Sequence, residues 1–176
     1  MDKTIYTIGY GGWGVGDFKR VLIDLGVSVL IDVRRWNKSR TLPEYSGLNL
    51  ASLLREAGIE YIWLPELGGY RKFGVDVENY GIAGCFESTG FRAYATYIAR
   101  RSDLKPLLSR LVEIASVKTT VLMCSERSPW ACHRKILSDY FVVKGFRVLH
   151  ILDLDRIVEH SLSKCAVVKN GELDYI

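Results

Sequence analysis

The chain has 176 residues, of which 48% are hydrophobic and 25% charged. This size and balance are typical of one compact globular domain, so we expect residues 1–176 to form a single domain. The sequence has no apolar run as long as a membrane span and no signal-peptide pattern, which favours the cytoplasm and argues against a membrane partner. The net charge of +4 fits acidic partners in general and does not single out nucleic acid.

Apolar periodicity and turn residues divide the chain into alternating strands and helices. The predicted strands are 4–8, 29–33, 61–64, 119–124 and 147–152. The predicted helices are 18–25, 49–57, 91–98, 104–114 and 128–143, with a short polar helix over 154–162. An Asn-Gly pair between two β-like runs predicts a hairpin over 165–176. Residues 70–90 show no periodicity, and a connection of that length is usually functional or mobile.

Three predicted helices end at a glycine directly before a strand, at Gly26, Gly58 and Gly145. The alternation predicts a three-layer α/β, Rossmann-like fold, with about five parallel strands and helices on both faces. The core of this fold would cover residues 4–152, and the helix and hairpin of 153–176 would follow it. In such sheets ligands bind beyond the carboxyl ends of the strands, so the loops after the strands should form the site.

The turn after residues 119–124 concentrates reactive side chains. A cation at the start of a helix is unfavourable, so we expect either Glu126 or a bound anion to compensate Arg134. His133 beside Cys132 suits acid–base chemistry, although a partly buried structural histidine is the plainer interpretation. Of the two thiols here, Cys124 at the strand end is the better placed nucleophile. Cys132 shares a predicted apolar helix face and fits a structural or a reactive thiol equally well.

The four cysteines are Cys85, Cys124, Cys132 and Cys165. Free thiols are expected in a cytosolic chain of this size, although Cys124 and Cys132 have the option of pairing. The spacing of Cys124, Cys132 and His133 is unlike that of zinc modules, so no metal is expected, and no pattern identifies a cofactor.

Two further groups of charged residues follow the second and third predicted strands. Asp32, Arg34 and Glu66 are either solvated strand ends with one salt bridge or groups that surround an anionic substrate. A basic loop with Trp36 at its centre is either an ordinary solvated surface or a phosphate-contacting surface for nucleic acid. Its basic residues are Arg34, Arg35, Lys38 and Arg40.

Several blocks of the sequence resemble the uncharacterised family catalogued as domain of unknown function four-eight-eight. They are Thr7-Ile-Gly-Tyr10, Leu30-Ile-Asp-Val-Arg34, Ser39-Arg40, Leu64-Pro-Glu-Leu-Gly-Gly69, Phe91-Arg-Ala-Tyr94 and Met123-Cys-x-Glu-x-x-Pro-Trp-x-Cys-His-Arg134. The resemblance implies an α/β domain. Tyr10 stands where many members are expected to have histidine.

The architecture is also similar to that of rhodanese-type domains, which would make Cys124 a sulfur- or phosphate-transfer residue or a redox thiol. A rhodanese loop, however, wraps its anion with glycines, whereas residues 125–130 contain no glycine and include Glu126.

Together these patterns predict an enzyme for a small anionic or nucleotide-like substrate; a nucleic-acid-binding module is the alternative, and the oligomeric state stays open. The candidate catalytic residues are Asp32, Glu66, Cys124, Glu126 and His133. The candidate substrate-binding residues, some of them carried by the resemblance, are Gly9, Tyr10, Arg34, Arg40, Gly68, Gly69, Arg92, Trp130, Cys132 and Arg134.

Overall fold

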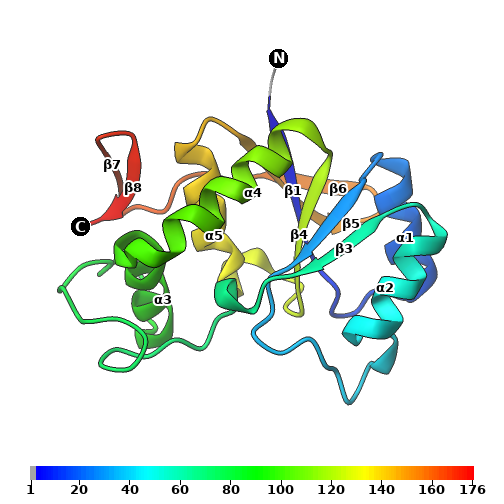
Figure 1. The fold of residues 1–176 in the computed structure, drawn as a ribbon, viewed down its shortest axis with the longest axis horizontal. Helices are drawn as coiled ribbons and strands as arrows, with labels where there is room; N and C mark the ends of the chain where they lie inside the picture. The colour runs from blue at the N-terminus through cyan, green and yellow to red at the C-terminus, as the bar shows by residue number, and fades with distance from the viewer. Residues whose placement is uncertain (1–2) are drawn as a thin grey trace.

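A computed structural model describes residues 3–176 and centres on a six-stranded sheet of order β3-β2-β4-β1-β5-β6 (Figure 1). Five strands run parallel: β1 Thr4–Gly9, β2 Val29–Asp32, β3 Glu60–Trp63, β4 Thr120–Cys124 and β5 Arg147–Asp153. The sixth, β6 Arg156–Glu159, pairs antiparallel with β5 at the edge. The predicted α/β fold with five parallel strands is therefore confirmed.

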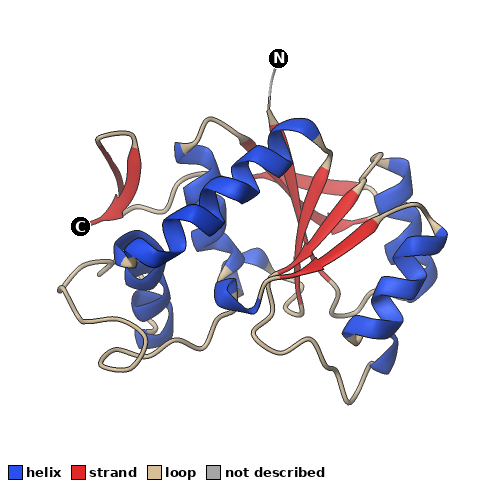
Figure 2. Cartoon of the chain, in the orientation of Figure 1, coloured by secondary structure: helices blue, strands red, loops and turns tan. Residues whose placement is uncertain are grey.

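Helices cover both faces of the sheet (Figure 2). One face carries α1 Val15–Asp24 and α2 Gly47–Glu56, and the other carries α3 Thr89–Arg100, α4 Lys105–Val117 and α5 Arg134–Val143. Each layer has its own apolar core, because alternate residues of the strands point to opposite faces. Ile8, Leu30 and Met123 pack toward α1 and α2, whereas Ile31, Leu122 and Val148 pack toward the other three helices.

The predicted glycine stops mark real helix ends. Gly26, Gly58 and Gly145 have φ angles of 70°, 74° and 92°. This left-handed conformation is costly for a residue with a Cβ. It ends each helix, and the chain then continues into the next strand.

Two predicted helix starts are wrong. The segment after β4 first makes a short 3-10 turn, Pro129–Ala131, and Cys132 is then extended with φ −138°. The α-helix begins only at Arg134, not at residue 128 as predicted. The helix α2 begins at Gly47 after Ser46, and Asn49 lies inside it and donates to the carbonyl of Pro43.

The polar helix predicted over 154–162 is also wrong, because this segment contains β6 instead. The predicted terminal hairpin is confirmed as β7 Ala166–Lys169 and β8 Glu172–Tyr175, a separate two-stranded sheet. Its turn residues Asn170 and Gly171 both have positive φ, 53° and 77°, as a type I′ turn requires.

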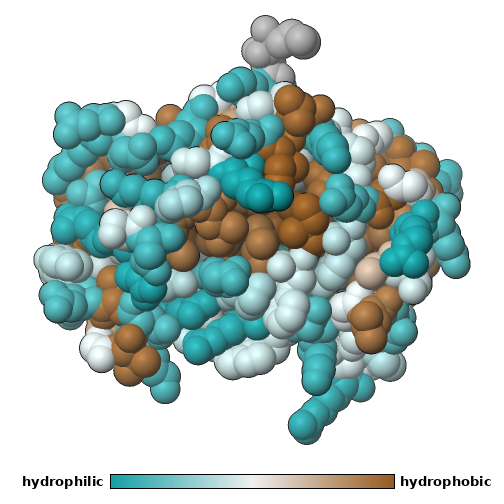
Figure 3. All heavy atoms as spheres, viewed as in Figure 1, coloured by the Kyte–Doolittle hydropathy of each residue, from teal (hydrophilic) through white to brown (hydrophobic). Residues whose placement is uncertain are grey.

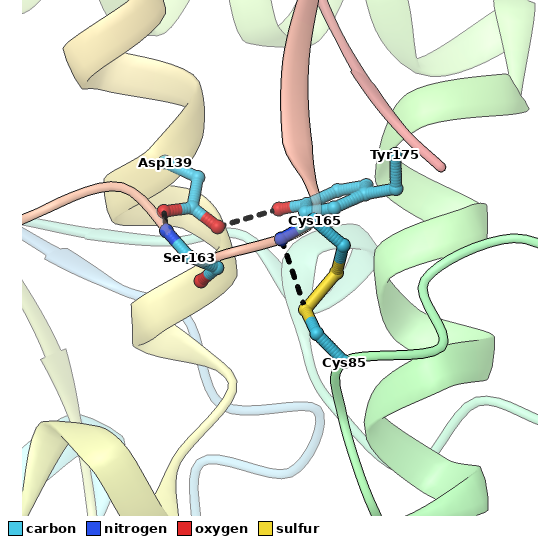
Figure 4. Close-up of a disulfide and its surroundings, with 5 residues drawn as sticks. All are labelled: Cys85, Asp139, Ser163, Cys165 and Tyr175. Carbon is cyan, nitrogen blue, oxygen red and sulfur yellow. Dashed lines mark hydrogen bonds between the residues drawn. A yellow bond between two sulfur atoms is a disulfide. The ribbon is translucent and has the colours of Figure 1, made fainter.

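A disulfide joins Cys85 of the long loop to Cys165 before the hairpin (Figure 4). The expectation of free thiols is therefore wrong for this pair. The fold brings two residues 80 positions apart to a Cα–Cα distance of 5.6 Å, and the sequence alone does not reveal such an approach. Cys124 and Cys132 are free and buried.

The face of the molecule shown in Figure 3 is largely polar, with apolar side chains gathered near its middle. Within residues 3–176, none of the helices combines the length and the apolar character that a membrane span needs.

Candidate functional site

The central strands β1 and β4 lie side by side, but the helices that follow them, α1 and α5, cover opposite faces of the sheet. Such a point leaves a crevice at the carboxyl edge, the usual ligand position in open α/β sheets. The loops after β1, β2, β3 and β4 meet at the lower edge of the sheet in Figure 1. They enclose most of a cavity of about 420 Å³. The residues lining it are Tyr10, Arg34, Arg35, Trp36, Lys38, Gly69, Tyr70, Ser88, Gly90, Phe91, Tyr94, Cys124, Ser125, Glu126, Ala131, Cys132 and His133.

Cys132 is a buried residue in the wall of this cavity, directly before α5. Its extended backbone turns the Sγ atom back onto the helix start, where the backbone N–H of Arg134 donates to it at 3.4 Å. Nδ1 of His133 lies 3.6 Å from the same sulfur. A helix N-terminus and an adjacent imidazole are the two surroundings that most often favour a thiolate.

The hydrogen bonds of His133 fix its orientation. Nε2 lies 2.8 Å from the carbonyl oxygen of Val33, which can only accept, so Nε2 carries a proton. Nδ1 therefore faces Cys132 and either accepts the thiol proton or, once protonated, donates to the thiolate. The ring also packs edge-to-face on Tyr94, with centroids 5.0 Å apart. The structure thus presents a positioned Cys–His pair at the cavity.

Arg134 is completely buried and makes no ion pair with a carboxylate within residues 3–176. Its Nε donates to Sγ of Cys124 at 2.9 Å, and its Nη2 donates to the backbone carbonyl of Glu126 at 2.6 Å. The expected ion pair with the Glu126 carboxylate is therefore wrong. Glu126 accepts a hydrogen bond from Arg134 through its backbone carbonyl instead. A buried guanidinium without a carboxylate stabilises negative charge nearby, and the groups within reach are the two thiols.

The two thiols differ in acidity. Burial by itself raises the pKa of both. For Cys132, a hydrogen bond from Cys124 and the positive charges of His133 and Arg134 outweigh burial and hold its pKa well below the ordinary range. For Cys124, burial and the nearby Cys132 together hold the pKa well above the ordinary range. The pair thus favours a thiolate on Cys132 and a protonated thiol on Cys124.

Asp32 and Arg34 form a buried pair beside the cavity. Both carboxylate oxygens of Asp32 accept from the guanidinium, at 2.9 and 2.7 Å, and Oδ2 also accepts from the hydroxyl of Tyr61. The same guanidinium donates to the carbonyl of Tyr45 at 2.8 Å. Although burial lowers the pKa of Arg34, the partnership with Asp32 outweighs it and raises that pKa. Because Asp32 neutralises the charge of Arg34, the basic loop has one cation fewer for binding phosphates than its sequence indicates.

The mouth of the cavity is aromatic and basic. Trp36 and Tyr70 are 61% and 78% exposed, with ring centroids 5.8 Å apart. Arg35 donates to the carbonyl of Tyr70 at 2.7 Å and lies over the ring of Trp36. Lys38 is exposed and lines the same opening. The carboxylate of Glu126, also exposed, makes no hydrogen bond or ion pair within the described residues.

The candidate residues thus divide between cavity walls and supporting positions. Those that line the cavity are Tyr10, Arg34, Gly69, Cys124, Glu126, Cys132 and His133. Those that do not are Gly9, Asp32, Arg40, Glu66, Gly68, Arg92, Trp130 and Arg134. Arg40, Glu66 and Trp130 are exposed outside the cavity, and Arg92 bonds to Thr89 on its own helix.

Two of the glycines outside the cavity allow close packing of the loops behind it. A Cβ on Gly9 would lie 1.7 Å from the carbonyl oxygen of Glu126, and one on Gly68 would lie 2.3 Å from the backbone of Arg35. Both positions hold neighbouring loops in contact, so their importance is steric.

The sequence did not identify several wall residues, namely Tyr70, Ser88 and Gly90. The only signal was the length of the irregular segment 70–90, which indicated a functional loop without saying which side chains it supplies. Figure 1 shows this loop and α3 on the same side of the sheet as α5.

Comparison with known families matches residues 15–141 to the family described as Domain of unknown function DUF488. Neither the curated proteins nor the solved structures gave a significant match. The matched region contains the walls of the cavity except Tyr10, and it includes the Cys132–His133–Arg134 cluster. Because the match covers well over half of the chain, the protein belongs to the family Domain of unknown function DUF488.

Proposed function

We propose that the protein is a thiol-dependent enzyme for a small anionic substrate, with Cys132 as nucleophile and His133 as its proton partner. The observation that carries the proposal is the position of the Cys132 sulfur, which contacts both the first N–H of α5 and Nδ1 of His133. Cys132 and His133 both line the cavity, and they supply the thiol and the imidazole. A nucleophile beside a base that is itself held by a third group is the usual arrangement for covalent catalysis. Here the third group is the carbonyl of Val33.

The chemistry follows from these positions. The Cys132 thiolate attacks an electrophilic carbon or phosphorus of the substrate, and a sulfur–substrate bond forms. The leaving group departs with the bonding electron pair and takes a proton from the imidazolium of His133. Water then attacks the intermediate, neutral His133 accepts the water proton, and the sulfur–substrate electron pair returns to Cys132.

The mouth of the cavity supports the substrate class. Arg35 and Lys38 provide positive charge without a carboxylate partner in the described part of the chain. The rings of Trp36 and Tyr70 provide flat surfaces on which a planar group such as a nucleobase would stack. An anionic substrate with a planar part fits both features, and Glu126 would then contact a donor group of the substrate.

Alkylation tests the nucleophile. In limiting iodoacetamide at neutral pH, the thiolate displaces iodide from carbon, and peptide mass spectrometry shows which cysteine carries the label. We expect Cys132 to be labelled first, in wild type and in the Cys124→Ser variant alike. Preferential labelling of Cys124 would overturn the proposal.

The charge of the probe tests the substrate class. Because the mouth of the cavity is basic, Cys132 should gain reactivity toward the anionic probe. The ratio of its alkylation rate with iodoacetate to its rate with iodoacetamide should exceed the same ratio for a free thiol. Lys38→Gln should reduce that gain, whereas Arg110→Gln, on the exposed side of α4 and outside the cavity, should leave it unchanged. Equal ratios in all three proteins would contradict an anionic substrate.

The contact of both thiols with Arg134 favours redox chemistry as a second candidate. Hydrogen peroxide would oxidise the Cys132 thiolate to a sulfenic acid, and the departing hydroxide would take a proton from the imidazolium of His133 to leave as water. The Cys124 thiol would then condense with the sulfenic acid to form a disulfide and a second water. Mass spectrometry after treatment with hydrogen peroxide tests this. A Cys124–Cys132 disulfide supports the redox role, and irreversible overoxidation of Cys132 without a disulfide contradicts it.

A further inference from the structure

A continuous chain of buried hydrogen bonds runs from α5 through the sheet and back to the thiol site. Nε2 of His160 lies 2.8 Å from Oδ1 of Asp139, and Nδ1 of His160 lies 3.0 Å from Nε2 of His150. Nδ1 of His150 lies 2.6 Å from the hydroxyl of Thr7. The same hydroxyl accepts from Nη1 of Arg134 at 2.9 Å. All five side chains are less than 9% exposed.

The direction of every bond in this chain can be assigned. Arg134 can only donate, so the Thr7 oxygen accepts, and the Thr7 hydrogen must go to Nδ1 of His150. His150 then donates from Nε2 to Nδ1 of His160. Finally, His160 donates from Nε2 to the carboxylate of Asp139. Reversing the histidine tautomers would leave the Thr7 hydroxyl hydrogen without an acceptor, which is costly for a buried group.

We propose that Asp139 and His160 are positioning residues of the thiol site: through His150 and Thr7 they hold Arg134 in place against Cys124 and Cys132. The catalytic consequence rests on the function proposed above, whereas the hydrogen-bonded chain itself does not. In every bond the donor lies on the side of the buried cation and the acceptor on the side of the buried carboxylate. The bond dipoles therefore add up in the direction that stabilises both charges.

The environment of His150 supports this assignment. Burial, reinforced by the neighbouring His160 ring and Arg134 guanidinium, lowers the pKa of His150 to about 3. His150 therefore stays neutral at physiological pH and keeps the acceptor nitrogen that Thr7 needs. The ring of Trp130 packs edge-to-face with that of His150, with centroids 6.1 Å apart.

The C-terminal segment fixes the far end of the chain. Asp139 also accepts from the hydroxyl of Tyr175 at 2.8 Å and from the backbone N–H of Ser163 at 3.0 Å. Figure 4 shows these two groups converging on Asp139 beside the Cys85–Cys165 disulfide. The segment that follows β6 thus orients a carboxylate that acts, through four other side chains, on the cavity.

Substitution of Thr7 provides the sharpest test, because within residues 3–176 its hydroxyl alone links Arg134 to His150 by hydrogen bonds. Thr7→Val keeps the shape and removes the link, and Thr7→Ser keeps the link. We expect Thr7→Val and His160→Phe each to raise the apparent pKa for alkylation of Cys132 by about one pH unit, with a roughly tenfold slower reaction below that pKa. Thr7→Ser should restore the wild-type profile.

A matched control separates this effect from general destabilisation. Thr120→Val removes another buried strand hydroxyl, one that donates to the carbonyl of Lys118 away from the chain. It should leave the alkylation profile unchanged. The double variant Thr7→Val/His160→Phe should shift the profile no more than either single change, because both break one chain. An unchanged profile in Thr7→Val and His160→Phe, in folded protein, would overturn the proposal.

Nitrogen NMR of the histidine rings tests the chain without relying on thiol chemistry. In wild type, His150 and His160 should both appear as neutral rings protonated at Nε2 at neutral pH. If they do and Cys132 is unreactive, the hydrogen-bonded chain stands, its catalytic role is lost, and the function proposed above fails. If either ring is protonated at Nδ1 instead, the chain itself is wrong.

Discussion

Asp32 illustrates how fully a polar residue at a strand exit can be engaged by its neighbours. Its position at the exit of β2 suggested a catalytic carboxylate. In the structure both of its oxygens are occupied by Arg34 and Tyr61, and the side chain has no exposed surface. The acidic group therefore fixes a neighbouring cation and the loop that carries it.

We predict that Asp32→Asn destabilises the fold by about 3 kcal/mol, because it leaves the buried Arg34 without a counter-charge. Urea unfolding monitored by tryptophan fluorescence measures this change. Glu66→Gln, at an exposed carboxylate, is the control and should change the stability by less than about 0.5 kcal/mol. An Asp32→Asn variant as stable as wild type would show that the pair contributes nothing to the fold.

The sequence placed the residues of the turn after β4 but not its local structure. Cys124, Cys132, His133 and Arg134 all lie where the pattern placed them, at the carboxyl edge of the sheet. The preference for Cys124 as nucleophile rested on its place at the strand end and on a helix starting at Pro129, which would turn Cys132 toward the sheet. The extended Cys132 and the later start of α5 place the sulfur of Cys132 at the helix end instead, and only coordinates reveal such a change.

Secondary elements with strong local signals were predicted well. The helix–glycine–strand repeats combine an apolar period with a residue that tolerates positive φ, so local sequence suffices to define them. The segment 154–162 has no such signal. It forms β6 because the open edge of β5 offers hydrogen bonds, and pairing of this kind depends on a neighbour that the local sequence does not contain.

The disulfide is the main covalent constraint on the loop 70–90 and the hairpin. It closes a separation of 80 residues. We predict that reduction lowers the free energy of unfolding by about 2–4 kcal/mol, mainly because the unfolded chain regains freedom. Unfolding in urea with and without reductant measures the difference.

The variant that combines Cys85→Ser with Cys165→Ser provides the control for this measurement. It should match the reduced wild type and show no response to reductant. If reductant leaves the unfolding of the wild-type protein unchanged, the two sulfurs are not joined in solution.

Across the whole molecule, the buried hydrogen-bonded chain should make the fold sensitive to mild acid. The pKa of His150 is lowered to about 3 by burial and by the neighbouring His160 and Arg134, whereas in the unfolded chain it is near its ordinary value. Below about pH 6.5 the unfolded chain therefore binds a proton that the folded protein does not, and the free energy of unfolding falls. The stabilisation is fully present above pH 6.5 and is lost progressively toward pH 3.

We predict a loss approaching 1.4 kcal/mol per pH unit from this residue between about pH 6 and 5, a window in which most carboxylates do not titrate. Urea unfolding at several pH values gives the slope for wild type and for His150→Phe. The variant should be less stable throughout but should have a flatter slope. Equal slopes would show that His150 titrates alike in the folded and unfolded states.

The overall architecture was accessible from the sequence because it depends on repeated local patterns. The chain from Asp139 to Arg134 was not, because its members come from β1, α5, β5 and the segment after β6 and share no spacing. Thr7, His150 and His160 had no signal as site residues, and only the packing of the sheet brings them together.

The central claim is that Cys132 is the low-pKa thiol of the pair, and ultraviolet titration of the thiolate tests it most directly. The absorbance of wild type near the thiolate band should rise in a step well below the ordinary thiol pKa of about 8.5. This step should persist in Cys124→Ser and disappear in Cys132→Ser. A step that disappears in Cys124→Ser, or no step below about pH 8 in wild type, would contradict the assignment.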